Sequence, residues 1–158
     1  MARAVHQTDG YPLRIPPDMR SFLVAPDELA AWVAEVDGEV AGHVSLRSRC
    51  SAGAVEVASR SAGVGQDGLG VVSRLLVSPA ARRRGVGRGL LDTARTEAVS
   101  RGLVPMLEVV TWQQQAVSLY EALGWARVGE AEIPLLDGSA LDVFVYVYQG
   151  SAAVIAEQ

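Results

Sequence analysis

A run of arginines and glycines is the segment of this chain best suited to chemistry. The first turn of a helix has unpaired N–H groups and the positive end of the helix dipole. Glycines there let a phosphate approach the backbone, and arginine side chains fork onto phosphate oxygens. The segment therefore predicts a pyrophosphate cradle where a strand runs into a helix. It reads Arg82-Arg83-Arg84-Gly85-Val86-Gly87-Arg88-Gly89.

Two common phosphate-binding patterns do not fit this segment. The Walker pattern needs a lysine, and all fourteen basic residues are arginine. The dinucleotide pattern G-x-G-x-x-G fails because the glycine that follows Gly87 comes one position early, at Gly89. The alternative is a glycine-rich turn without a ligand. A glycine inside a helix costs about 1 kcal/mol relative to alanine, so three glycines favour a ligand.

Two motifs in order resemble the GCN5-related N-acetyltransferases (GNAT). The first resembles the family's acetyl-CoA signature, whose core Q/R-x-x-G-x-G/A is met by Arg82, Gly85 and Gly87. The second resembles the family motif L-E-V…N-x-x-A-x-x-L-Y-x-x-L-G-F. It comprises Leu107-Glu108-Val109 and Ala116-x-x-Leu119-Tyr120-x-x-Leu123-Gly124-Trp125.

The resemblance implies acetyl-CoA as co-substrate and no metal. It implies that Leu75 to Val77 pair with the pantetheine arm and that backbone N–H groups of Arg83 to Arg88 bind the pyrophosphate. The N–H of Val77 would polarise the thioester carbonyl, as an aimed donor stabilises an oxyanion. Gln113 stands where the family has asparagine. The implied cofactor-binding residues are Leu75, Leu76, Val77, Arg82, Arg83, Arg84, Gly85, Val86, Gly87, Arg88 and Gln113.

The resemblance also implies two proton-transfer residues. Tyr120 matches the tyrosine that protonates the leaving thiolate, which suits a phenol with a pKa of about 10; the alternative is a core tyrosine. Glu108 matches the proton acceptor of the ribosomal-protein alanine acetyltransferases, although a solvated strand residue is an equal alternative. Val71 stands where many members have another glutamate. His43 or ordered water could replace that base, but a structural histidine is the simpler interpretation.

Periodicity predicts an α/β fold. A hairpin over 32–46 turns at Asp37-Gly38, and further strands cover 69–77, 103–110, 125–129 and 141–148. Helices are expected over 86–101 and 114–123. Residues 51–68 are expected to form a connection with one helical turn. With the resemblance, we expect a GNAT-like mixed, mostly antiparallel sheet flanked by helices, with a splayed strand pair at the acetyl-CoA site.

The length of 158 residues predicts a single N-acetyltransferase domain over 1–158. It would have an irregular Pro-rich start over 1–26, with at most a short helix around 18–23, and a tail over 150–158. The polar N-terminus, the lone Cys50 and the lack of a long apolar run predict a cytoplasmic protein. Cys50 as a nucleophile is an alternative to an incidental cysteine.

A net charge of −4 argues against a nucleic-acid partner, and no membrane partner is expected. The function implied is acetyl transfer from acetyl-CoA to a primary amine, on a small molecule or a peptide, by direct attack in a ternary complex. The alternative is a CoA-binding regulatory or non-catalytic module, and a homodimer is left open. Candidate acceptor-lining residues are Tyr11, Phe22, Trp32 and Trp112.

Overall fold

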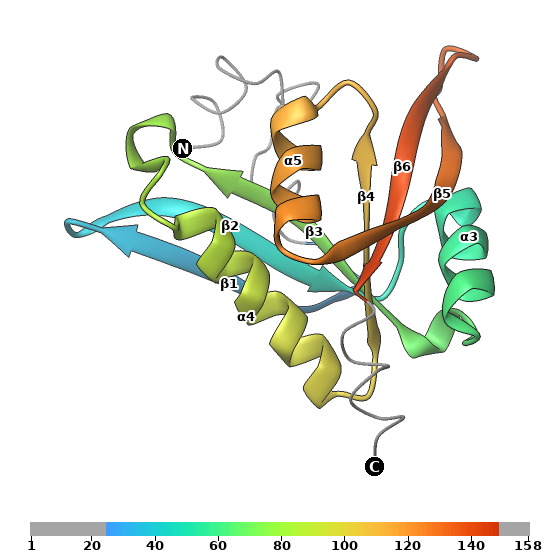
Figure 1. The fold of residues 1–158 in the computed structure, drawn as a ribbon, viewed down its shortest axis with the longest axis horizontal. Helices are drawn as coiled ribbons and strands as arrows, with labels where there is room; N and C mark the ends of the chain where they lie inside the picture. The colour runs from blue at the N-terminus through green and yellow to red at the C-terminus, as the bar shows by residue number, and fades with distance from the viewer. Residues whose placement is uncertain (1–24, 149–158) are drawn as a thin grey trace. The chain divides into compact units, whose positions relative to one another are not determined.

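The computed structural model describes residues 25–148. Its six strands form one mixed sheet in the order β1-β2-β3-β4-β6-β5 (Figure 1). The mixed, mostly antiparallel sheet and three α-helices confirm the expected fold class. The predicted helix around 18–23, Tyr11 and Phe22 lie outside the described residues. The chain divides into two compact units, described in turn; the first includes 25–47 and 72–96, and the second 48–71 and 97–148.

The first unit is built on the predicted hairpin. Strands β1 (Glu28–Val36) and β2 (Glu39–Arg47) pair antiparallel. The turn between them has φ of +53° at Asp37 and +81° at Gly38, as expected for Asp-Gly in a two-residue hairpin. Next to β2 lies β3 (Leu69–Val77), whose bounds are those predicted.

Helix α4 (Val86–Ser100) begins in the first unit, after the short helix η2 (Pro79–Ala81). It packs closely on β2, because a Cβ at Gly42 would come within 2.7 Å of Leu90 Cδ1 and 3.0 Å of Val86 Cγ1. Gly42 therefore lets the start of α4 approach the strand backbone. At the other end, Gly102 has φ of +75° and Leu103 N–H donates to the carbonyl of Ala98, a Schellman ending that the sequence predicted.

The second unit is a sheet with a helix against it. Strands β4 (Val104–Val110), β5 (Trp125–Pro134) and β6 (Ala140–Tyr148) pair antiparallel in the order β4-β6-β5. The short helix η1 (Gln66–Gly68) leads into β3. Helix α5 (Gln114–Ala122) precedes β5, and Gly124, with φ of +90°, follows it.

The expectation of one helical turn over 51–68 is wrong. Helix α3 (Ala52–Ala62) occupies eleven residues and lies beside β5 and β6 (Figure 1). Ser51 caps its N-terminus and Gly63 ends it with φ of +71°, both standard end signals. Most of its residues are alanines, valines, serines and a glycine, a composition that is also typical of a connecting segment. It buries Ala54 and Ala58 in a core that also contains Leu69, Val71, Met106, Val145 and Val147.

Candidate active site

The predicted phosphate loop connects η2 to α4 in the first unit. Arg83 has φ of +64° and Gly85 has φ of +76°, next to the helix N-terminus at Val86. A Cβ at Gly85 would meet no heavy atom within 4 Å. Left-handed residues beside a helix start direct successive N–H groups into one anion-binding concavity. The loop therefore fits a pyrophosphate group.

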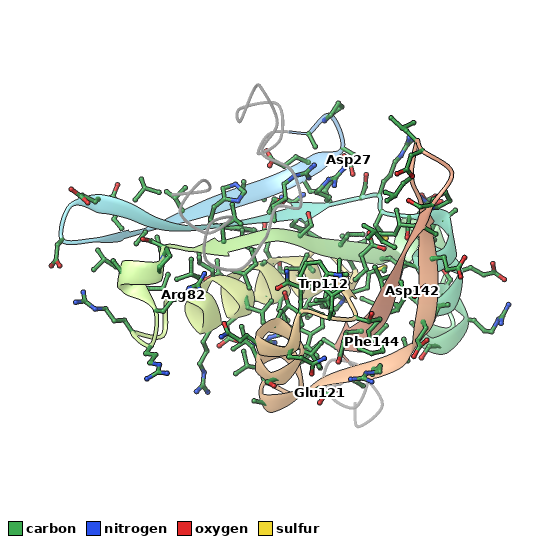
Figure 2. All side chains as sticks on the ribbon, turned by 90° about the horizontal axis from the view of Figure 1, so that it is seen from above. Asp27, Arg82, Trp112, Glu121, Asp142 and Phe144 are labelled. Atoms are coloured by element: carbon green, nitrogen blue, oxygen red, sulfur yellow. The ribbon has the colours of Figure 1, made fainter. Side chains whose placement is uncertain are left out.

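The arginines of this loop do not all have the same surroundings. Arg82 is half-buried, and its Nη2 donates to the carbonyl oxygen of Val77 at 3.3 Å, linking the loop to the end of β3 (Figure 2). Arg84 forms an exposed 3.6 Å pair with Asp37, which contributes little to stability. Arg83 and Arg88 are exposed. Arg82 thus holds the loop to the end of β3, while the other three arginines of the loop supply positive charge.

Strand β3 changes direction at Arg74, just before the predicted pantetheine-pairing residues 75–77. Arg74 has φ of +52° within the strand, a conformation that costs energy for a residue with a Cβ. Its carbonyl oxygen lies 2.9 Å from Nδ1 of His43, which is buried. A carbonyl only accepts, so His43 donates from Nδ1. This supports the structural interpretation of His43.

The parallel pairing of β3 with β4 is short. In the described residues it covers Leu69–Val71 and Val104–Met106. Strand β4 continues to Val110 and stays paired with β6 along that length.

The two proton-transfer candidates belong to opposite faces of the β4–β6 pair. Leu107 is paired with Tyr146, and Glu108 with Val145. Directly paired residues share a face and successive residues alternate. The side chains of Tyr146 and Glu108 therefore emerge on opposite faces. Tyr120 packs its ring against Tyr146, at a centroid distance of 5.9 Å, so it lies on the face opposite to Glu108.

Glu108 lies on the face covered by α3, which packs on Val145 and Val147. Its Oε2 accepts a hydrogen bond from the hydroxyl of Ser51, at 2.6 Å. Sequence reasoning missed Ser51, because the helix it caps was not predicted. The signal available was the cap residue itself, followed by an alanine-rich stretch and Gly63.

The other candidate residues have different surroundings. Val71 is buried in the core around α3. Its side chain is aliphatic and cannot act as a base. Gln113 precedes α5, without a side-chain cap bond. Trp112 is 51% exposed and Trp32 is half-buried in β1. Cys50 is half-buried and is not in a disulfide.

Within residues 25–148, His, Cys, Asp and Glu side chains form no group of three or more that could hold a metal ion. None of the helices in these residues is long and apolar enough to cross a membrane.

Comparison with known proteins decides the family. The model of the acetyltransferase (GNAT) family matches residues 3–125, which include the phosphate loop, Glu108 and Tyr120. The chain belongs to this family. The GNAT resemblance of the two sequence motifs is thereby confirmed.

Known relatives of this GNAT chain differ in length. N-acetylaspartate synthetase of Danio rerio is 29% identical over 121 residues; these are 77% of this chain and 38% of the relative, so the chain spans well under half of it. The ribosomal-protein-S18-alanine N-acetyltransferase of Escherichia coli has a TM-score of 0.60 at 22% identity, covering 92% of this chain and 84% of that one. A Bacillus anthracis str. Ames protein in complex with acetyl-CoA has a TM-score of 0.58 at 17% identity, covering 78% and 62%.

Proposed function

We propose that this protein transfers an acetyl group from acetyl-CoA to a primary amine by direct attack in a ternary complex. The observation that carries this proposal is the placement of Glu108 and Tyr120 on opposite faces of β4. Direct transfer needs a proton removed from the attacking amine and another delivered to the departing sulfur. A base and an acid on opposite faces of one strand can each perform its task without exchanging a proton directly with the other.

The residues have distinct tasks in this reaction. Glu108 takes a proton from the ammonium, so that the nitrogen lone pair can attack the thioester carbon. The N–H of Val77 polarises the thioester carbonyl. Tyr120 gives its proton to the sulfur as the carbon–sulfur bond breaks. The nitrogen releases its second proton as the intermediate collapses, and a proton from solvent restores the phenol, which leaves an amide and free CoA. Acetyl-CoA supplies the activated acetyl group.

Most of the residues assigned to cofactor binding belong to the first unit. The N–H groups of Arg83 to Arg88 bind the pyrophosphate, with the arginine charges around them, and residues 75–77 pair with the pantetheine arm. Gln113 is assigned to the coenzyme arm. The Danio rerio and Escherichia coli relatives are both named for N-acetylation, which supports an amine acceptor.

The test is a thiol-release assay with acetyl-CoA and a panel of amines: alkyl amines, free amino acids, peptides and amine antibiotics. CoA release matched mole for mole by acetylated amine in the mass spectrum is expected. Binding of CoA in calorimetry without release for any amine would instead identify a non-catalytic CoA-binding module.

Initial rates then test direct attack. Varying both substrates should give intersecting double-reciprocal lines, and Cys50→Ala should leave the rate unchanged. Parallel lines together with an inactive Cys50→Ala variant would indicate an acetyl-cysteine intermediate and overturn the ternary mechanism.

A further inference from the structure

The hydroxyl of Ser51 joins the N-terminus of α3 to Glu108. Ser51 Oγ lies 2.6 Å from Glu108 Oε2 and 3.4 Å from the backbone nitrogen of Ala54. A hydroxyl has one proton and two lone pairs. The Ala54 N–H can only donate, so it donates to a lone pair of the Ser51 oxygen. The hydroxyl proton of Ser51 is therefore donated to the Glu108 carboxylate.

This arrangement restrains the rotation of the Glu108 side chain. Glu108 is half-buried on β4, and Ser51 is itself fixed by its capping bond to α3. The carboxylate is thus tied to the positive end of a helix, which favours a negative charge. Ser51 occupies one lone pair of Oε2, whereas both lone pairs of Oε1 are left by this bond for a proton from an amine.

We propose that Ser51 is a positioning residue for the general base Glu108. Its hydroxyl holds Oε2 and thereby directs Oε1 to the acceptor amine. This inference rests on the proposed function of Glu108, and it adds a residue that belongs to neither of the two sequence motifs.

Ser51→Gly is the test variant, because glycine replaces a cap residue at little cost to the helix. Removing a positioned base altogether costs ~10²–10⁴-fold, so mispositioning it should lower kcat by about 10-fold, with CoA affinity unchanged. Ser51→Thr keeps the hydroxyl and should restore the rate. The control is Ser100→Gly, since Ser100 Oγ lies 3.3 Å from Glu97 Oε2 at an exposed site; its kcat should equal the wild-type value.

A double-mutant cycle shows whether Ser51 acts through Glu108. In the Glu108→Gln background, Ser51→Gly should produce no further loss of kcat. Equal fold-losses in both backgrounds, or no rescue by Ser51→Thr, would overturn the positioning role.

The same cycle in urea unfolding gives a readout without substrate. Coupled residues should show non-additive shifts of the unfolding midpoint, and additive shifts would overturn the inference whatever the activity. Coupled unfolding without acetyl transfer to any amine would overturn the proposed function, and the positioning role with it.

Discussion

The ring of Tyr120 packs against the ring of Tyr146 with centroids 5.9 Å apart and planes inclined at 54°. Tyr146 is fully buried, and its hydroxyl donates to Glu121 Oε1 at 2.9 Å and accepts from Arg127 Nε at 3.2 Å. Arg127 also bonds Glu121 and lies over the ring of Phe144, at 3.7 Å (Figure 2). A network on α5, β5 and β6 therefore fixes the surface on which Tyr120 rests.

Tyr146→Phe should remove the two hydrogen bonds of the Tyr146 hydroxyl while keeping the ring that contacts Tyr120. A net loss of about 0.5–1.5 kcal/mol in the free energy of unfolding is expected, as for one hydrogen-bonded hydroxyl. We expect kcat to fall less than in Tyr120→Phe. Urea unfolding and steady-state kinetics check both, and a kcat as low as that of Tyr120→Phe would assign Tyr146 a direct role.

The pH dependence of this network has a defined sign. Burial raises the pKa of Tyr146 above its ordinary value, so the folded state favours the neutral phenol. The resulting stability is complete below the unfolded pKa of about 10 and is lost as the pH rises through the folded pKa. Above pH 10, the unfolding midpoint should decline more steeply in wild type than in Tyr146→Phe, and equal slopes would contradict this.

Tyr120→Phe should lower kcat by ~10²–10⁴-fold if protonation of the thiolate limits the rate. The phenyl ring keeps the packing against Tyr146 and Trp125, so CoA affinity should stay within a factor of about two. Steady-state kinetics and calorimetry measure the two effects. Equal turnover of variant and wild type would remove Tyr120 from the mechanism.

Glu108→Gln should depress kcat/KM most at low pH. An alkyl ammonium has a pKa of about 10, so near neutrality nearly all acceptor must lose a proton on the enzyme. The ratio of wild-type to variant kcat/KM should therefore shrink as the pH rises. A ratio that stays constant over the accessible pH range would mean that water or His43, and not Glu108, accepts the proton of the amine.

Gly87→Trp should abolish CoA binding, because a bulky side chain at the helix start blocks a phosphate from the backbone. Gly65→Trp is the matched control, since its φ is −75° and a Cβ there meets no heavy atom within 4 Å. Calorimetry should show CoA binding for the control alone. Unchanged affinity in a folded Gly87→Trp protein would move the pyrophosphate site elsewhere.

Gly42→Ala should destabilise the packing of α4 against β2. The added Cβ would lie 2.7 Å from Leu90 Cδ1 and 3.1 Å from the carbonyl oxygen of Leu76. Leu90 can rotate, but the strand backbone must shift, and such overpacking costs about 1–3 kcal/mol. Urea unfolding beside Gly65→Ala measures the loss, and equal stability of the two variants would show that α4 yields without cost.

Local signals in the sequence determined much of this protein. Asp37-Gly38 specified the hairpin turn, Pro79 closed β3, and Gly102 and Gly124 ended their helices, because each acts within a few residues of its own backbone. The motifs from Val77 to Gly87 and from Leu107 to Trp125 indicated the GNAT family for the same reason: their spacing is a property of the chain itself.

Tertiary structure alone decided how Glu108 is placed. A shift of one residue in the β4–β6 register would turn its side chain to the opposite face, and the sequence does not encode that register locally. The register of Glu108 with Val145 directs it toward α3, where Ser51 meets it. The Ser-, Gly- and Ala-rich composition of α3 hid that helix from the sequence analysis. Ser51 and Glu108 are 57 residues apart in the sequence, so only folding brings them together.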